Sequence, residues 1–230
     1  DPLYFKMHPL IKAYKNEFRK NSDKEFAEGA QKYMKSEMPY YGVRSPIKKK
    51  IDFELKKKYT IENFEEYIEV IEELWDNAKF REERYAAMTI LSQYKEYHTL
   101  KIIPLIEHII ITGAWWDIID GISPNTVGGL LKKYPKEMRK TLKSWNNSNH
   151  IWLRRASILS QLKFKSETDE ELLYSFIKNR VHEKEFFIRK AIGWSLREYS
   201  KTNKESVKKF INENKNELSN LSIREGSKYI

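Results

Sequence analysis

Apolar residues spaced about 3.6 positions apart recur along the whole chain, and this periodicity constrains the fold more than any other feature. Short polar stretches such as 146–149 separate the periodic segments, as expected between helices. No segment alternates like a strand, and the 8 glycines and 7 prolines are too few for a turn-rich β fold. We therefore predict an all-α protein. The expected helices cover 8–19, 23–37, 46–58, 61–77, 81–97, 100–111, 114–134 with a break at Pro124, 136–145, 150–164, 170–181, 184–200 and 205–214.

An internal repeat sharpens the prediction. Ile-Leu-Ser-Gln occurs at 90–93 and again at 158–161, which is two steps of 34 residues, and one further step reaches 192–195. A period of this size with two helices per unit is typical of a helical solenoid, in which each helix pair buries its apolar face against its neighbours. We expect the second helices of successive units to line a concave surface. Steps of 35 and 34 from Asp120 reach Arg155 and Arg189, which would then lie in one row across the repeats.

Charge points to a polyanionic partner. Lysine and arginine number 43 against 33 acidic residues, and the formal net charge is +10, so the concave surface is expected to be basic and nucleic acid is the favoured partner. Cysteine is absent, which excludes disulfides and thiolate metal sites and suits a reducing cytoplasm. The five histidines show no metal-ligand spacing, and we expect no metal. No apolar run is long enough for a membrane span, and no segment reads as a signal peptide.

The segment Trp115-Trp116-Asp117-Ile118-Ile119-Asp120 carries the first candidate site residues. In a helix, Trp116 and Asp120 share one face, while Trp115 belongs to an apolar stripe with Ile118, Ile119 and Ile122. An aromatic ring beside a carboxylate, away from the packing face, is suited to receive a cationic group. The alternatives are that Trp116 packs against the next repeat, and that Asp120 pairs with a nearby lysine of its own helix.

Two later repeats supply further candidates. Arg155 lies on an apolar stripe with Ile151, Ile158, Leu159 and Leu162, where a charge is costly unless it is paired or lies at the edge of a groove. It is either a site residue or a structural arginine that ties two repeats together.

Trp194 and Arg197 stand one helical turn apart in the following unit. Like Trp116, Trp194 has packing against the next repeat as its alternative role. The lysine runs at 48–50 and 56–58 are interpreted as solvated faces with nonspecific contact to phosphate.

Several separated motifs, taken in order, resemble the AlkD family of DNA alkylation repair glycosylases, which are HEAT-like helical repeat proteins. The resemblance runs from about Met7 to the C-terminus. The motifs are Gln31-Lys32-Tyr33-Met34-Lys35, Trp115-Trp116-Asp117-Ile118-Ile119-Asp120, Ile151-Trp152-Leu153-Arg154-Arg155-Ala156, Gln161-Leu162-Lys163 and Ala191-Ile192-Gly193-Trp194-Ser195-Leu196-Arg197. The first of them matches most loosely.

The resemblance implies roles for individual residues. Asp120 is implied to be catalytic and, with Trp116, to contact the deoxyribose that carries the lesion. Arg155 and Trp194 are implied to lie at the active site. Three more residues are implied to contact DNA or the lesion region: Arg197, Lys163 and Tyr33.

These features predict a monofunctional DNA glycosylase of base excision repair that releases cationic N3- and N7-alkylated purines, such as 3-methyladenine and 7-methylguanine, from duplex DNA. The resemblance implies capture of the lesion without base flipping. We expect Arg155 to hold flanking phosphates bidentately, and we expect no cofactor and a monomer. The alternative is a noncatalytic helical-repeat scaffold that binds nucleic acid or an acidic protein.

We expect one helical-repeat domain over 7–230 and take residues 1–6, which precede Met7, as an addition to the native start. The expected location is the bacterial cytoplasm, in association with the nucleoid when the protein is bound to DNA.

Overall fold

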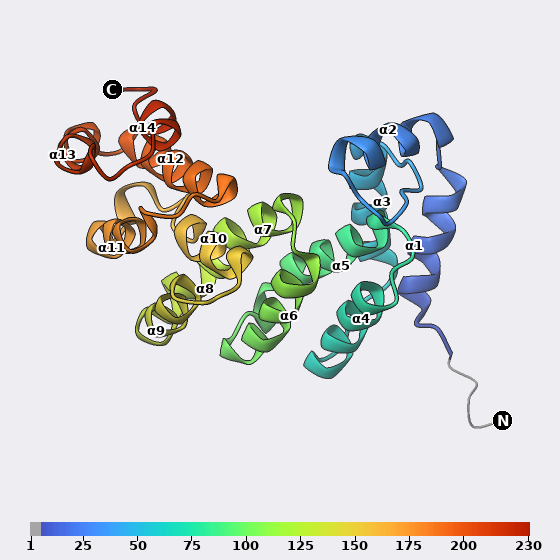
Figure 1. The fold of residues 1–230 in the computed structure, drawn as a ribbon. Coiled ribbons are helices and arrows are strands. Elements are labelled where there is room, and N and C mark those ends of the chain that lie inside the picture. Colours follow the sequence, from blue (N-terminus) through green and yellow to red (C-terminus); the bar gives the residue numbers. More distant parts are fainter. Residues whose placement is uncertain (1–5) are drawn as a thin grey trace. The chain divides into compact units, whose positions relative to one another are not determined.

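The computed structural model describes residues 6–230, and every regular element in this part of the chain is a helix (Figure 1). The all-α prediction is confirmed. None of the described helices is both long and apolar enough to cross a membrane. Of the residues that we took as an addition, 1–5 lie outside the described part.

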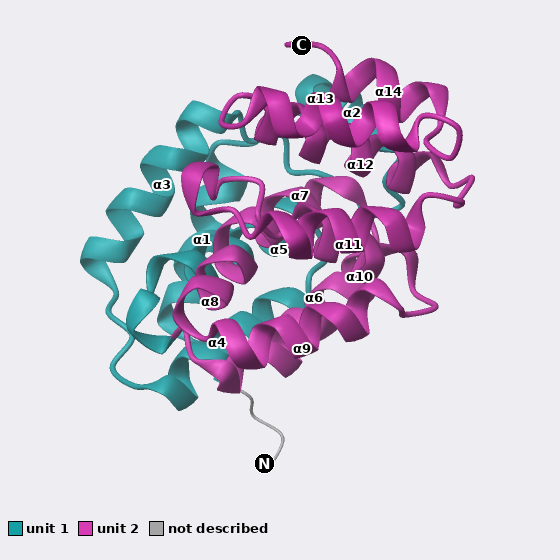
Figure 2. Ribbon diagram, turned by 90° about the vertical axis from the view of Figure 1, so that its left-hand side faces the viewer, with its two compact units in different colours: residues 1–97 teal, residues 98–230 magenta. Residues whose placement is uncertain are grey.

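The chain forms two compact units, of which the first ends at Tyr97 and the second covers His98–Ile230 (Figure 2). The prediction of one domain over 7–230 stays a prediction. Each of the two units has its own buried apolar core. All but one of the predicted site residues belong to the second unit, and Tyr33 belongs to the first.

The first unit contains five α-helices and a short 3-10 helix at Lys95–Tyr97. The α-helices are α1 Pro9–Lys20, α2 Lys24–Met34, α3 Ser45–Lys58, α4 Phe64–Asp76 and α5 Arg81–Gln93. Helix starts follow from local capping chemistry. The carboxylate of Asp23 accepts from the amide of Phe26 and begins α2, and the amide oxygen of Asn63 accepts from Glu66 and begins α4.

A buried carboxylate fixes the loop between α2 and α3. Glu82 accepts the backbone amides of Tyr41, Gly42 and Val43 at 2.8–3.0 Å, and only 2% of the residue is exposed. Gly42 has φ of +88°, and a Cβ there would lie 2.0 Å from the carbonyl oxygen of Asp23. The loop therefore requires both the acid and the glycine.

The second unit begins with a 3-10 helix at Leu100–Ile102 and continues as a series of helices. These are α6 Ile103–Gly113, α7 Trp116–Ile122, a π-helical turn at Ser123–Val127, α8 Gly128–Lys133, α9 Pro135–Asn146, α10 Ile151–Leu159, a 3-10 helix at Lys165–Glu167, α11 Glu170–Arg180, α12 Phe186–Ser200, α13 Lys204–Asn214 and α14 Asn220–Gly226. The periodicity predicted all of these α-helices except α14.

Contacts between successive repeats confirm the repeat length in this unit. Three side-chain pairs join residues that are 35 positions apart: Asp120 with Arg155, Lys132 with Glu167, and Lys190 with Glu225. Helix α10 packs against both α7 and α12, and α12 packs against α14. The second helices of successive repeats are therefore neighbours in space. A basic concave surface formed by them stays a prediction.

We predicted that Pro124 breaks the helix that contains it, and this prediction was wrong. The helix continues from α7 to α8 through one π turn, in which the amide of Gly128 donates to the carbonyl of Ser123, five residues back. Proline cannot donate the amide that an α-helix needs at this position, and the wider turn accommodates that loss. The hydroxyl of Ser123 donates to the carbonyl of Ile119 at 2.6 Å and adds a further bond within the turn.

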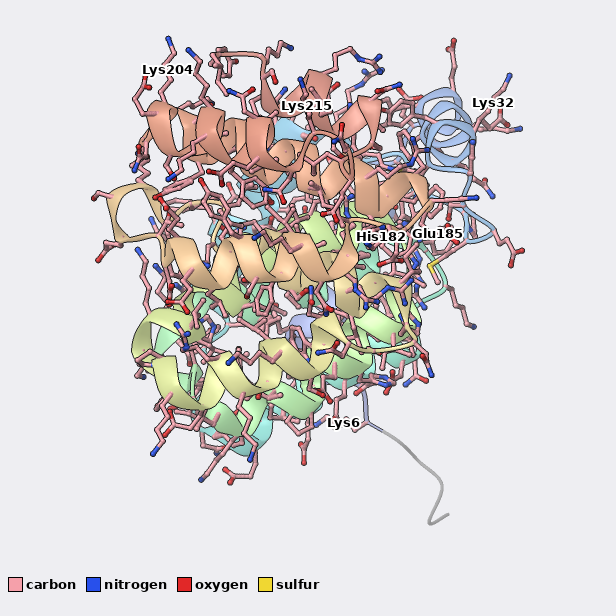
Figure 3. The ribbon with its side chains drawn as sticks, turned by 60° about the vertical axis from the view of Figure 1, so that its left-hand side comes forward. Lys6, Lys32, His182, Glu185, Lys204 and Lys215 are labelled. Carbon is pink, nitrogen blue, oxygen red and sulfur yellow. The ribbon has the colours of Figure 1, made fainter. Side chains whose placement is uncertain are left out.

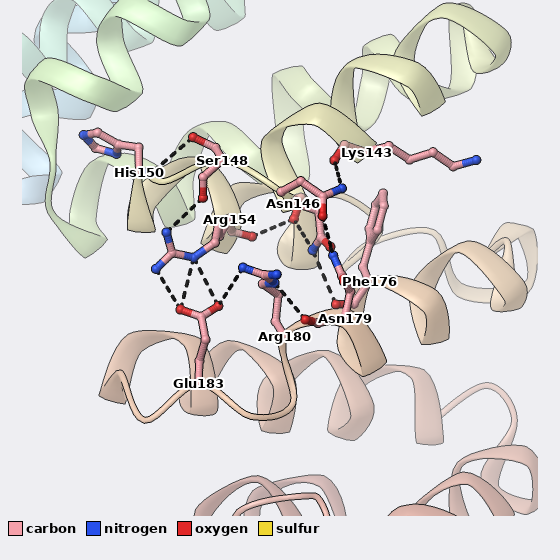
Figure 4. Close-up of polar contacts among 11 residues, drawn as sticks. Lys143, Asn146, Ser148, His150, Arg154, Phe176, Asn179, Arg180 and Glu183 are labelled. Carbon is pink, nitrogen blue, oxygen red and sulfur yellow. Dashed lines mark hydrogen bonds and ion pairs between the residues drawn. The ribbon is translucent and has the colours of Figure 1, made fainter.

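A polar cluster ties the turn before α10 to the turn before α12 (Figure 4). Glu183 accepts two nitrogens of Arg154 at 2.7–3.1 Å, and Arg154 also donates to the carbonyl of Ser148. The amide nitrogen of Asn179 donates to the side-chain oxygen of Asn146 at 2.7 Å. His182 and Glu185, on either side of Glu183 in this turn, are labelled in Figure 3. This cluster sets the register of α10 against the start of α12.

Two glycines let α14 pack closely on α12. A Cβ at Gly193 would lie 2.7 Å from the Cβ of Glu225 and 3.3 Å from backbone atoms of Ser222. A Cβ at Gly226 would lie 3.0 Å from the Cβ of Leu196. Because these neighbours are backbone or Cβ atoms, they have little freedom to move away.

We predict that Gly193→Ala lowers the free energy of unfolding by about 1–2 kcal/mol, since overpacking outweighs the gain in helix propensity. Gly129→Ala is the matched control, because nothing lies within 4 Å of a Cβ at that helical position. We expect this control to stabilise the protein by about 0.5–1 kcal/mol. Urea unfolding of both variants measures the two changes. Equal effects of the two substitutions would contradict the close packing of α12 on α14.

Candidate functional site

A bidentate ion pair between Asp120 and Arg155 forms the centre of the candidate site. Nε of Arg155 donates to Oδ1 of Asp120 at 2.9 Å, and Nη2 donates to Oδ2 at 3.0 Å. Asp120 lies in α7 and Arg155 in the first half of α10, so the pair joins two successive repeats. The Arg155 side chain is 4% exposed, whereas that of Asp120 is 19% exposed. The carboxylate therefore remains accessible from solvent, and the guanidinium lies behind it.

Arg155 donates three hydrogen bonds in this structure. Two of its nitrogens bind Asp120, and Nη1 donates to the backbone carbonyl of Phe187. The guanidinium also lies 5.6 Å from the centre of the Phe187 ring. The guanidinium is buried and bound by these partners in this structure, and phosphate binding by Arg155 stays a prediction. Arg155 is paired, as its position on an apolar stripe requires.

The first two members of the predicted row, Asp120 and Arg155, pair with each other, whereas Arg189 has a different partner. Nε of Arg189 donates to the carbonyl of Lys184, at the turn before its own helix. The partner of Arg155 in α12 is the carbonyl of Phe187 instead.

Opposing effects act on the Asp120 carboxyl. Burial raises its pKa above the ordinary value of 3.8, and the nearby charge of Asp117 adds to the rise. The hydrogen bonds and the positive charge of Arg155 act in the opposite direction. Arg155 is therefore the group that favours the ionised form of a carboxylate in a partly desolvated position.

Aromatic residues surround this pair on two sides. Trp116 begins α7, one turn before Asp120 on the same face, and is neither fully buried nor fully exposed. Trp115 precedes the helix and packs edge-on against Trp152 at 5.9 Å and Phe187 at 5.3 Å between ring centres. Ile118, Ile119 and Ile122 are buried, as the sequence predicted. The separation between the packing stripe and the face of Trp116 and Asp120 is thus confirmed in α7.

Trp194 and Arg197 stand one turn apart on α12, which packs against α10. Trp194 is partly exposed. The guanidinium of Arg197 lies 3.6 Å from a carboxylate oxygen of Glu225, a residue of α14 that also accepts from Lys190 at 2.9 Å. These two cations and the nearby Lys228 hold the pKa of Glu225 below its ordinary value.

The other two predicted contacts are Lys163 and Tyr33. Lys163 follows α10 and is exposed, and its ammonium donates to Oδ1 of Asn125 at 2.6 Å. Tyr33 lies in α2 of the first unit and is 74% exposed. The roles of Lys163, Arg197 and Tyr33 stay predictions.

A cavity of about 590 Å³ lies at the C-terminal ends of α10 and α12. Its lining includes Lys163, Lys165 and Lys201, together with the hydroxyl groups of Thr168 and Thr202. The cavity therefore has a cationic rim next to one of the predicted DNA contacts. Among residues 6–230, no three histidine or acidic side chains gather as they would around a metal ion.

Sequence reasoning missed several residues that hold the site together. Phe187 contributes a backbone carbonyl, which no side-chain pattern reveals. Glu225 lies in α14, a helix too short for a clear periodic signal. Asn125 follows Pro124, and proline inside a periodic segment was the one available signal that the helix is irregular there.

We predict that Arg155→Gln raises the pKa of Asp120 further, because the cation that opposes burial is removed. We also expect a loss of about 3 kcal/mol of stability, since a partly buried carboxylate loses its partner. The folded variant then binds the proton more tightly than the unfolded chain does, so the loss shrinks as the pH falls through the raised pKa.

Carboxyl-detected NMR titration and urea unfolding at several pH values measure both effects. Arg139→Gln is the matched control, because Arg139 pairs with Asp169 rather than with Asp120 and lies outside the polar cluster before α10. An Asp120 pKa that is unchanged in Arg155→Gln would contradict the role given to the guanidinium.

Comparisons with known proteins identify the family of this chain. The family model described as DNA alkylation repair enzyme matches residues 14–230. A solved structure described as a predicted DNA alkylation repair enzyme from Enterococcus faecalis is 30% identical and superposes with a TM-score of 0.83. The match covers 91% of this chain and 97% of that one. A comparison with curated proteins finds no match. The chain belongs to the DNA alkylation repair enzyme family.

Proposed function

We propose that this protein is a DNA glycosylase that hydrolyses the N-glycosidic bond of N3- and N7-alkylated purines in duplex DNA. The observation that carries the proposal is the Asp120 carboxylate, which is accessible on one side and fixed on the other by two hydrogen bonds from a buried arginine. Membership of the DNA alkylation repair enzyme family supports the class of substrate.

The chemistry of the substrate explains why a carboxylate is sufficient. A purine alkylated at N3 or N7 is cationic, so it departs as a neutral base when the glycosidic bond breaks and takes the bonding electron pair with it. Positive charge then develops on the deoxyribose. A preorganised anion next to that sugar is more stabilising in the transition state than in the ground state, which is the requirement for catalysis.

The same carboxylate can orient the water that completes the reaction. Water adds to C1′ of the sugar cation and releases one proton, and an ionised Asp120 is placed to accept a hydrogen bond from that water. Arg155 keeps this carboxylate ionised and holds its two oxygens in one plane. We assign Arg155 this part rather than contact with the DNA backbone.

Trp116 and Trp194 are proposed to contact the lesion. The electron-rich face of an indole attracts a cation, and both the alkylated base and the developing sugar cation carry positive charge. Both tryptophans are partly exposed. We propose that they receive the nucleotide on an open surface without base flipping, which would tolerate adducts larger than a methyl group.

Binding of the duplex is assigned to the basic residues outside the catalytic pair. The formal net charge of +10 supports a strong nonspecific attraction to phosphates. We propose that Lys163, Arg197 and Tyr33 contact the DNA, and that the protein acts as a monomer in the cytoplasm.

We predict that Asp120→Asn lowers the release of 7-methylguanine from methylated duplex DNA by at least about 100-fold, since the amide carries no charge to stabilise the sugar cation. DNA binding should stay within a few-fold of the wild type. Chromatography of the freed base measures release, fluorescence anisotropy measures binding, and a melting curve confirms that the variant is folded.

The matched control for this substitution is Asp117→Asn. It removes the same charge from the same helix, but the bidentate pair with Arg155 is formed by Asp120 and stays in place. We expect it to retain release. A wild type that binds DNA but frees no base would reject the enzymatic assignment and favour a noncatalytic scaffold, as would an Asp120→Asn variant with undiminished release.

We also predict that affinity for an undamaged duplex falls at least tenfold between about 50 and 200 mM salt, as expected for three or more phosphate contacts. Arg197→Gln should reduce the slope of log affinity against log salt by about 1. Lys178→Gln, an exposed position on α11, is the control and should leave the slope unchanged. Salt-insensitive binding would indicate a protein partner instead.

A further inference from the structure

The π turn in the helix of Asp120 has a consequence for a residue that neither the sequence pattern nor the family match points to. In a regular α-helix, residue 124 follows Asp120 by one turn and lies on its face, and residue 125 is turned away. A turn closed between residues five apart is wider than an α turn and shifts the residues that follow it around the helix axis. The bond from the amide of Gly128 to the carbonyl of Ser123 identifies such a turn here.

Three further residues support this local geometry. Pro124 has no amide hydrogen to donate to the carbonyl of Asp120, so an α turn would leave that carbonyl without a donor. Gly128 lets the next turn approach the end of α10, because a Cβ there would lie 2.7 Å from the carbonyl oxygen of Ser160. The wide turn and the close approach together bring Asn125 next to Lys163.

Asn125 uses both ends of its side-chain amide. Its nitrogen donates to the carbonyl of Gly121 at 2.7 Å, one turn back in the same helix. Its oxygen accepts from the ammonium of Lys163 at 2.6 Å. Only this orientation of the amide satisfies both partners, since a carbonyl needs a donor and an ammonium needs an acceptor. The amide is therefore anchored to the backbone and holds the lysine in one place.

We infer that Asn125 is a positioning residue for Lys163, and that the two form a phosphate-binding site at the exposed junction of the π turn and the end of α10. This inference rests on the proposed function for the identity of the ligand, a phosphate of the DNA backbone. The ammonium has three hydrogens, of which one is used by Asn125, so two remain for phosphate oxygens. An exposed lysine otherwise loses much rotamer freedom when it binds a phosphate. Asn125 removes part of that cost before DNA arrives.

A double-mutant cycle tests the inference, with a short undamaged DNA duplex as the probe and anisotropy as the readout. We expect Asn125→Ala to weaken binding threefold to tenfold in the wild-type background and to have no further effect in the Lys163→Gln background. Lys163→Gln should lower the slope of log affinity against log salt by about 0.9, the value for one phosphate of duplex DNA. Asn125→Ala should leave that slope nearly unchanged, because the charge of Lys163 remains.

Asn125→Asp gives a second, independent readout. The carboxylate is nearly the same size and shape as the amide and places a negative charge beside the ammonium, which competes with phosphate. We expect it to lower both the affinity and the salt slope as Lys163→Gln does, with a small loss of thermal stability because the carboxylate cannot donate to the carbonyl of Gly121. A purely structural role of Asn125 would not change the salt slope.

Asn147→Ala is the matched control. Like Asn125, Asn147 is exposed and donates from its side-chain nitrogen to the carbonyl four residues back, in this case that of Lys143 at 2.8 Å. It lies at the end of α9 and should leave DNA binding unchanged.

Additive effects of Asn125→Ala and Lys163→Gln, or no effect of Asn125→Ala, would overturn the inference. Measuring whether the wild type releases free base tests the proposed function separately. Coupled binding without base release would therefore uphold the phosphate site and reject the glycosylase.

Discussion

The ion pair between Asp120 and Arg155 is the interaction on which the candidate site depends. A partly buried carboxylate favours protonation, and a neutral acid could not stabilise a sugar cation. Arg155 counters that tendency because its guanidinium is buried, bidentate and held at its third nitrogen by the carbonyl of Phe187. The buried arginine thus favours the charged form of the carboxylate that is proposed to act on the substrate. Both meanings that the sequence left open for Arg155, a site residue and a tie between repeats, apply to the same side chain.

The architecture of the second unit explains how such a pair arises. Side chains that are 35 residues apart meet repeatedly, since each repeat places its second helix beside that of the next one. Interactions at the two turns before α10 and α12, above all that of Arg154 with Glu183, hold the register in which Arg155 reaches both partners. Gly193 and Gly226 extend the same close packing to the last helix. Positions that look like ordinary packing therefore determine the geometry of a charged pair.

The helices and the buried face of α7 could be predicted from the sequence, because periodicity and repeat length indicate which residues are buried. The helices were placed within a few residues of their observed bounds, and the separation of Asp120 from the stripe of Ile118, Ile119 and Ile122 followed from helical geometry. What could not be predicted depends on backbone detail or on facing side chains. The π turn at Pro124 was read as a break, Phe187 reaches Arg155 through its backbone carbonyl, and the seven residues of α14 carry too few apolar positions for a period.

Because Asp120 and Arg155 belong to different repeats, neither repeat contains a complete site. Gain or loss of a whole helix pair before α6 or after α12 would leave Asp120, Arg155 and the carbonyl of Phe187 in place, whereas the same event between α7 and α10 would separate the acid from its cation by one full step of the array. In a repeat protein of this kind, duplication of helix pairs is therefore compatible with the site near the ends of the array but not between the two repeats that hold Asp120 and Arg155.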